Sequence, residues 1–402
     1  MKLSNIFLAG ALALGTGGAW ADCAFENTVP LKSLTAGFEA WKAATSAMAE
    51  CGNFEAELDQ EFRTKQPAAF AAEPSLYHIG GVSNGTFNPL YNAGTIRPLD
   101  DLVAKHGQHL EPNQLIKING QTWAIAMMVN AQHLMFRKDI LADLGIDPPT
   151  SYDEVLAAAE AIREAGVVDY PLGGTYMTGW NLGNEFINNY LGFGGEFFDE
   201  NNHPSINNEH GMATLELMAA LSENMDPEFL QSDSTYVQQQ FQQGKIAMAN
   251  LWASRAGNVV DPNESQVVGL VEMDSAPVGP VRPHAALWWD GIVIAKNITD
   301  EEADAAFRVA MEGIDTEMVM ANNAAAIWLI DGYEPGPLSA GAAATAANGA
   351  VPYPASPALG LMHNALGTGL SDFLTGAKDA AATLIDIEAA YVTAAKEAGL
   401  IN

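Results

Sequence analysis

Basic residues are scarce in this chain of 402 residues, which has 18 lysines and arginines against 49 aspartates and glutamates. The formal net charge at pH 7 is −31 with the histidines counted as neutral. Nucleic acids and anionic lipid surfaces are bound through basic patches, so the charge argues against both classes of partner. It fits a protein that stays soluble in a salty or crowded compartment.

Cysteine is almost absent. The two cysteines, Cys23 and Cys51, form no C-x-x-C motif, which argues against a redox enzyme. An even pair in an oxidising compartment usually forms a disulfide, and we expect a Cys23–Cys51 bond here. It would close a loop of about 28 residues and stabilise the fold by about 3–4 kcal/mol. Two buried thiols are the alternative.

Long apolar runs are also missing. No stretch reaches the roughly 18 apolar residues of a transmembrane helix, so no membrane span is predicted. Residues 1–21 form a separate segment, in which Lys2 precedes an apolar run at residues 6–14 and an A-x-A site at residues 19–21. This pattern is typical of a cleaved secretory signal peptide. We expect the remaining chain to begin at Asp22 and to lie free in the periplasm.

Metal and cofactor motifs are not found. The eight histidines are scattered, and the sequence has no H-E-x-x-H pattern, zinc-spaced Cys/His cluster, phosphate-binding loop or EF-hand. We therefore expect no metal and no cofactor.

One short motif resembles a catalytic one. Gly81-x-Ser83-x-Gly85 matches the nucleophile elbow G-x-S-x-G, between a predicted strand at residues 76–79 and a predicted helix at residues 86–93. A secreted serine hydrolase that uses Ser83 is therefore one hypothesis, although no H-G-G-G segment supplies an oxyanion hole. We favour a glycine-rich turn in which Ser83 and Asn84 offer a hydroxyl and an amide to a polar ligand. An ordinary solvated turn is the other interpretation.

The chain is distinctive in its tryptophans. Trp252 ends a predicted strand, and Trp180 stands in a glycine-rich loop. Trp288 and Trp289 lie beside Asp290 in another predicted strand. Indole faces next to a carboxylate suit sugar rings, which have apolar faces and hydroxyl edges. They would also suit a quaternary ammonium group. The alternative is that each tryptophan belongs to the core.

Two further aromatic residues are candidates for the site. Trp41 lies in a predicted amphipathic helix at residues 37–50, where it could face either the core or a ligand. Tyr176 begins a segment at residues 176–189 that is rich in aromatic and amide side chains.

The stretch at residues 122–150 organises the rest of the chain. Two predicted strands, at residues 124–129 and 132–136, flank the polar Asn130, and a helix follows that ends at Gly145. A chain that passes directly from one sheet into another, with a polar residue at the crossing, is what the hinge of a two-lobed clamp requires.

Two segments carry a family resemblance. The first is Asn130, Phe136-Arg137-Lys138-Asp139, Gly145, Pro148-Pro149-Thr150 and Tyr152-Asp153-Glu154. The second is Phe241-x-x-Gly244-Lys245-Ile246-Ala247-Met248. Together they resemble family 1 of the extracellular solute-binding proteins of ABC importers, the maltose-binding-protein-like carbohydrate class. The pattern departs after Pro354, where relatives often have a tryptophan and this chain has Ala358 or Leu359.

The resemblance implies an α/β protein with the type II periplasmic-binding-protein fold, in which a ligand cleft separates two lobes. Three chain crossings would form the hinge, near residues 128–132, 289–291 and 348–352. The N-terminal lobe would comprise residues 22–129 and 291–349, and the C-terminal lobe residues 130–290 and 350–402.

The resemblance also implies a function without catalysis. A monomer would capture a sugar or oligosaccharide by hinge closure and deliver it to the membrane permease of an ABC importer. Another small polar solute, such as a compatible solute, is the alternative ligand. The resemblance makes Asn130 a polar contact in the hinge and Trp252 a stacking residue. The expected ligand-binding residues are Trp41, Ser83, Asn84, Asn130, Tyr176, Trp180, Trp252, Trp288, Trp289 and Asp290.

Overall fold

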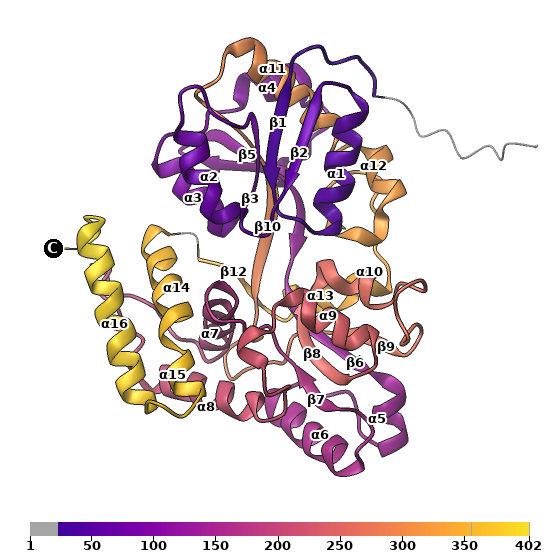
Figure 1. Cartoon of the computed structure of the whole chain (residues 1–402), viewed down its shortest axis with the longest axis vertical. Helices are drawn as coiled ribbons and strands as arrows, with labels where there is room; N and C mark the ends of the chain where they lie inside the picture. The colour runs from indigo at the N-terminus through magenta and orange to yellow at the C-terminus, as the bar shows by residue number, and fades with distance from the viewer. Residues whose placement is uncertain (1–22, 355, 402) are drawn as a thin grey trace, which may run out of the picture.

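The computed structural model describes residues 23–354 and 356–401, so the predicted signal peptide lies outside the described residues. In this part of the chain the named strands form two sheets, each covered by helices, and the sheets lie in two lobes (Figure 1). The fold is therefore α/β and two-lobed, as the sequence predicts. Cys23 and Cys51 form the expected disulfide in the first lobe.

The first lobe contains the larger sheet, with strand order β11-β5-β10-β3-β1-β2, while β4 pairs with β5 and β12 with β10. The strands β1, β2 and β3 are parallel, whereas β10 runs antiparallel to β3 and β5. Its strands are β1 (Leu31–Thr35), β2 (Phe54–Leu58), β3 (Ile79–Ser83), β4 (Leu115–Ile118), β5 (Gln121–Asn130), β10 (Ala286–Ile294), β11 (Ile327–Trp328) and β12 (Val351–Pro352). Its helices are α1 (Glu39–Glu50), α2 (Phe62–Ala71), α3 (Asn84–Asn92), α4 (Asp100–His106), α11 (Asp300–Glu312) and α12 (Thr316–Ala321).

The second lobe is built on a sheet with strand order β7-β8-β6-β9. In it, α14 packs against both α7 and α16. The strands are β6 (Gln132–Arg137), β7 (Tyr170–Gly173), β8 (Ile246–Trp252) and β9 (Val271–Asp274). The helices are α5 (Lys138–Leu144), α6 (Tyr152–Ala165), α7 (Trp180–Gly192), α8 (Glu209–Ser222), α9 (Ser234–Gln242), α10 (Ala256–Val259), α13 (Pro337–Ala347), α14 (Pro357–Gly369), α15 (Ser371–Leu374) and α16 (Ala380–Glu397).

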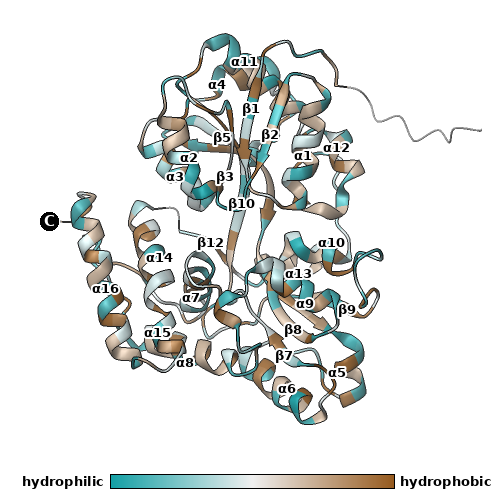
Figure 2. Ribbon diagram, in the orientation of Figure 1, coloured by the Kyte–Doolittle hydropathy of each residue, from teal (hydrophilic) through white to brown (hydrophobic). Residues whose placement is uncertain are grey.

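Each lobe has its own hydrophobic core. In the first lobe, Leu34 and Met127 on the sheet pack with Phe307 of α11. In the second lobe, Leu134 on the sheet packs with Phe186 of α7. Figure 2 shows hydrophilic and hydrophobic residues mixed along surface helices such as α16, as expected for helices with one buried face. None of the helices in the described part of the chain has the length and apolar character needed to cross a bilayer.

Local signals place several element boundaries. Asn119 and Gly120 have φ angles of 52° and 83°, so they form the tight turn between β4 and β5 that an Asn-Gly pair favours. The Thr299 side chain accepts a hydrogen bond from the Glu302 backbone, which caps α11. Gly145 has a φ of 68° and ends α5 in the left-handed conformation.

The glycine-rich segment before α3 differs from its prediction. Gly80 and Gly81 belong to the buried strand β3 and not to a turn. A Cβ atom on Gly80 would lie 2.7 Å from Phe70, and one on Gly81 would lie 2.8 Å from Trp41. These glycines therefore let α2 and α1 pack closely on the sheet, which is a tertiary requirement that local turn propensity does not register.

Two direct connections join the sheets. Ala131 separates β5 of the first sheet from β6 of the second, and β10 extends from the first sheet toward the second lobe (Figure 1). The third connection follows β11, because α13 packs against β9 and β6 of the second sheet. Residues 337–347 thus lie with the second lobe, and the third crossing precedes the position at 348–352 that the sequence predicts.

Candidate ligand site between the lobes

Three tryptophans from different parts of the chain meet in one aromatic cluster, which we define as Trp180, Trp252 and Trp288. Trp180 is the first residue of α7, Trp252 ends β8 and Trp288 lies in β10. The ring centroids are 5.5 Å apart for Trp180 and Trp288, and 5.9 Å apart for Trp252 and Trp288. The cluster therefore joins both sheets and a helix of the second lobe.

The cluster is enclosed. Trp288 is 4% exposed and Trp252 is 8% exposed, while Trp180 is half-buried. The sequence predicts a glycine-rich loop at Trp180. Instead, Gly179 has a φ of 101° and α7 begins at the next residue. The helix start fixes the indole in place against the other two rings.

Strand alternation separates the neighbouring Trp289 from this cluster. Successive side chains on a strand point to opposite faces, so Trp288 and Asp290 share one face of β10 while Trp289 lies on the other. The Trp289 ring lies 5.9 Å from Phe87 of α3 in the first lobe. We therefore place Trp289 outside the cluster.

Two residues that the sequence does not single out extend the cluster. The Tyr353 ring lies 4.1 Å from Trp288, and the His363 ring stacks 5.1 Å from Trp180. The Tyr353 hydroxyl and Nδ1 of His363 are 2.8 Å apart, and Nε2 of His363 is 2.8 Å from the Trp180 carbonyl. Burial lowers the pKa of His363 to about 4. The ring is therefore neutral at pH 7, and it donates from Nε2 and accepts from Tyr353.

These two residues occupy the region where the resemblance expects a tryptophan. Ala358 and Leu359, the residues at that position, are buried in α14. The aromatic rings next to the cluster in this region thus come from Tyr353 before α14 and His363 within it. The one signal in the sequence was the presence of aromatic residues on either side of the departing position.

A buried carboxylate borders the cluster. Asp290 is 8% exposed, and burial raises its pKa to about 7. The positive charge of Arg63 and a hydrogen bond from the Trp41 indole oppose this rise in the pKa. At neutral pH the carboxyl group can therefore either accept or donate a hydrogen bond.

Arg63 reaches the cluster from the first lobe. It lies in α2, and its guanidinium carbon is 4.4 Å from the centroid of the Trp180 ring in the second lobe. This cation–π contact crosses the junction between the lobes. Sequence reasoning missed Arg63, because nothing in the local pattern of α2 indicates a contact with a residue so distant along the chain.

The chain has a counterpart among known protein families. The model of the family described as bacterial extracellular solute-binding protein matches residues 53–312, well over half of the chain. The chain belongs to this family. Its members are binding proteins that act outside the cytoplasm, in agreement with the resemblance seen in the sequence.

Solved structures of solute-binding proteins share the fold. A protein of Agrobacterium radiobacter K84 in complex with ribitol has a TM-score of 0.81 and 21% identity, covering 90% of this chain and 98% of that one. A protein of Agrobacterium vitis S4 with bound D-mannitol has a TM-score of 0.76 and 20% identity, with coverages of 92% and 99%. Maltose-bound MalE3 of T. maritima has a TM-score of 0.75 and 18% identity, with coverages of 90% and 99%.

Several predicted site residues of this solute-binding protein have internal partners. Ser83 has an extended backbone with φ −117° and ψ 174°, and its backbone N–H donates to the Thr86 hydroxyl at the start of α3. The Asn84 side chain donates to the Leu287 carbonyl at 3.3 Å and accepts from the Trp289 backbone at 3.4 Å. Both residues therefore join α3 to neighbouring elements.

Asn130 connects the two sheets at the first crossing. Its amide nitrogen donates to the Ser254 hydroxyl at 3.1 Å, and its oxygen accepts from the Ser254 backbone at 3.3 Å. Asn130 thus ties the end of β5 to the segment that follows β8.

Tyr176 and Trp41 are buried in the lobes. Trp41 is 1% exposed in the core of the first lobe, with its indole close to Asp290. Tyr176 lines a small cavity of about 20 Å³ in the second lobe, together with Glu185. That volume fits about one water molecule. Burial raises the pKa of Glu185 to about 7, against hydrogen bonds from Thr175 and Gln132.

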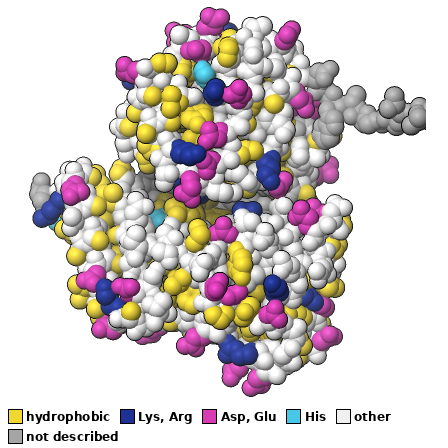
Figure 3. All heavy atoms as spheres, in the orientation of Figure 1, with side chains coloured by type: hydrophobic (Ala, Val, Ile, Leu, Met, Phe, Trp, Pro, Cys, Tyr) yellow, Lys and Arg dark blue, Asp and Glu magenta, His cyan; other side chains and the backbone are white. Residues whose placement is uncertain are grey.

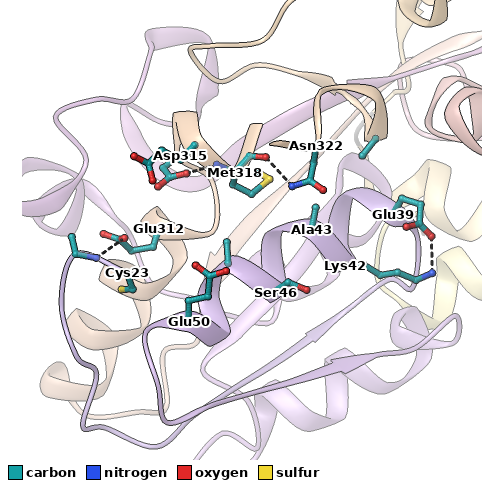
Figure 4. Close-up of a pocket in the computed structure, with 14 residues that line it drawn as sticks. Cys23, Glu39, Lys42, Ala43, Ser46, Glu50, Glu312, Asp315, Met318 and Asn322 are labelled. Atoms are coloured by element: carbon teal, nitrogen blue, oxygen red, sulfur yellow. Dashed lines mark hydrogen bonds and ion pairs between the residues drawn. The ribbon is translucent and has the colours of Figure 1, made fainter. Parts of the chain in front are cut away.

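A separate groove lies on the first lobe between α1 and α12 (Figure 4). Its volume is about 590 Å³, and its rim carries carboxylates such as Glu50 and Asp315. Lys42 and Glu39 pair with each other at 2.6 Å. Acidic side chains are expected over much of a surface with this net charge, and none of the predicted ligand-binding residues lines the groove.

Proposed function

We propose that this protein captures a sugar or polyol between its lobes and delivers it to the membrane permease of an ABC importer. The aromatic cluster beside the buried Asp290, at the junction of the two lobes, carries the proposal. Indole faces stack on the apolar faces of sugars, and a carboxyl group exchanges hydrogen bonds with their hydroxyls. The relatives that hold ribitol, D-mannitol or maltose support this class of ligand.

The protein acts in the periplasm as a monomer without covalent chemistry. The predicted signal at residues 1–21 and the Cys23–Cys51 disulfide support an oxidising compartment reached by secretion. Ser83 is buried, has an unstrained extended backbone and begins α3, whereas a nucleophile elbow needs a strained turn with an exposed hydroxyl. A fluorophosphonate probe should therefore leave the protein unlabelled, and labelling at Ser83 would favour the hydrolase instead.

A thermal-shift screen tests the ligand class. The panel contains ribitol, D-mannitol, maltose and glycine betaine. A ligand present at 100 times its Kd adds about 2.7 kcal/mol to the free energy of unfolding. We expect at least one sugar or polyol to stabilise the protein. Stabilisation by glycine betaine alone would move the ligand to the compatible solutes, while the assignment to the solute-binding family would stand.

A further inference from the structure

Arg63 occupies a position that decides which charge the site accepts. Its guanidinium carbon lies 4.4 Å from the centroid of the Trp180 ring and 4.8 Å from that of its neighbour Phe62. An aromatic cluster that binds a cationic ligand must leave a ring face free for it. Here the protein places a cation of its own on Trp180.

The guanidinium has hydrogen-bonding capacity to spare. Its Nε atom is buried and has no hydrogen-bond partner among the described residues. In the same part of the chain, no salt bridge joins Arg63 to Asp290, although the two charges attract each other. A buried donor without an acceptor is costly, so a ligand that supplies an acceptor at this point gains from the contact.

Arg63 and Asp290 also balance each other in charge. A neutral ligand with neighbouring hydroxyl groups can donate to the Asp290 carboxylate and accept from the Arg63 guanidinium at the same time. A cationic ligand would meet the guanidinium, and an anionic ligand would meet the carboxylate. Like charges brought together in a poorly solvated site repel strongly.

We propose that Arg63 is a specificity-determining residue, which makes the site select neutral polyhydroxylated ligands and reject quaternary ammonium compounds. The inference rests on the proposed function and narrows it to one charge class. Arg63 belongs to the first lobe and contacts Trp180 of the second lobe, so it lies where a ligand held between the lobes can contact it.

Calorimetry on the full chain after signal cleavage tests the proposal with ribitol, D-mannitol, maltose, choline, glycine betaine and gluconate. The wild type should bind at least one of the three neutral compounds and should bind choline, glycine betaine and gluconate more weakly. Arg63→Met keeps the length and apolar contact of the side chain but removes the charge and the donors. The substitution should weaken binding of the neutral ligand by about 10- to 100-fold. It should also reduce the ratio of the affinity for the neutral ligand to the affinity for choline.

Two further variants separate a binding role from a structural one. Arg308→Met is the matched control, because the Arg308 guanidinium lies 3.6 Å from the Phe25 ring of the same lobe, outside the cluster. It should leave every affinity unchanged. Arg63→Lys keeps the charge but loses the planar set of donors, so it should still reject choline while it weakens binding of the neutral ligand. This variant remains informative if Arg63→Met fails to fold.

Three results would overturn the inference. Choline, glycine betaine or gluconate could bind the wild type as tightly as any neutral compound, or folded Arg63 variants could keep wild-type affinities. In the second case sugar or polyol binding would stand and only the role of Arg63 would fall. Failure of all three neutral compounds to bind the wild type would overturn the proposed function together with the inference.

Discussion

Trp288 and Trp289 are consecutive residues of β10, yet their rings belong to different environments. Trp288 lies 5.9 Å from Trp252 in the second lobe, whereas Trp289 lies 5.9 Å from Phe87 in the first. The two-residue period of a strand causes the separation, since adjacent side chains point to opposite faces. One strand thereby provides both a ring of the aromatic cluster and a ring that packs against α3.

A tryptophan inside the cluster and one outside it give a matched pair of variants. Trp252→Ala should weaken ligand binding by roughly 2–4 kcal/mol, or about 30- to 1,000-fold in Kd, because a buried aromatic residue at the centre of a site is a typical hot spot. Trp289→Ala should destabilise the first lobe and leave the affinity of the folded protein nearly unchanged. Calorimetry measures the affinities, and circular dichroism checks the fold.

The comparison has a clear negative outcome. Trp252 is largely buried against Trp180 and Trp288, so its truncation also costs stability. A folded Trp252→Ala protein with wild-type affinity would show that this tryptophan belongs to the core alone and that the ligand binds elsewhere.

Features set by neighbouring residues could be predicted from the sequence. The Asn119–Gly120 turn and the Thr299 cap depend on contacts within a few positions, and both are present. The run through Asn130 was recognisable because two apolar strands of unequal surroundings flank it. The tryptophans were recognisable as candidates because Trp252 ends a predicted strand, Trp288 lies near Asp290 and Trp180 stands among glycines.

Features set by tertiary contacts could not be predicted. Gly80 and Gly81 look like a turn, but they are a strand because Phe70 and Trp41 leave no space for a Cβ atom. Helix α13 is rich in alanine and lacks an apolar repeat, so its position on the second lobe was missed. Arg63 joins the site only through Trp180, which is distant along the chain.

The burial of Asp290 predicts a pH-dependent stability. Its pKa is raised from 3.8 to about 7 in the folded protein, so the unfolded chain loses this proton first as pH rises. Asp290 therefore destabilises the ligand-free protein progressively between about pH 4 and 7, and fully above that range. Each unit by which the folded-state pKa exceeds the unfolded-state pKa lowers the free energy of unfolding at high pH by about 1.4 kcal/mol. The full effect is therefore on the order of a few kcal/mol.

Asp290→Asn removes this effect at almost constant volume. The free energy of unfolding of the variant should exceed that of the wild type by more at pH 8 than at pH 5. Urea unfolding of both proteins at both pH values measures this difference. Surface carboxylates with lowered pKa, such as Glu302, act in the opposite direction but are common to both proteins and cancel in the comparison. An equal difference in stability at the two pH values would contradict the prediction.

Glu185 offers an internal reference for the same measurement. Burial also raises its pKa to about 7, but it lies inside the second lobe beside Thr175 and Gln132. Glu185→Gln should therefore show the same pH trend without ligand. Saturating ligand should reduce the pH dependence of the stability difference between the wild type and Asp290→Asn, but not that between the wild type and Glu185→Gln. The reason is that ligand hydroxyls would stabilise the ionised carboxylate that they contact, which is Asp290.

The disulfide predicts a loss of stability without a loss of binding. Replacing both Cys23 and Cys51 with serine should lower the free energy of unfolding by about 3–4 kcal/mol, since the bond closes a loop in the unfolded chain. The bond lies in the core region of the first lobe and away from the aromatic cluster. The Kd for the ligand should therefore be unchanged at a temperature where the variant is folded. A changed Kd with unchanged stability would contradict this assignment.

Ligand binding should bring the lobes together. The surface is hollowed between them (Figure 3), and the candidate contacts come from both sides, with Arg63 in the first lobe and Trp180 and Trp252 in the second. A ligand that touches both lobes binds the closed state more tightly and shifts the population toward it. The direct crossings at Ala131 and β10 leave few residues to absorb the rotation.

Small-angle scattering should therefore give a smaller radius of gyration at saturating ligand than without it. Trp252→Ala at the same ligand concentration is the control and should keep the ligand-free profile, because too little ligand is bound. The negative test uses a ligand that calorimetry has shown to bind. If the wild type then gives the same scattering profile with and without this ligand, the site fills without a change in lobe geometry, and the clamp mechanism would have to be abandoned.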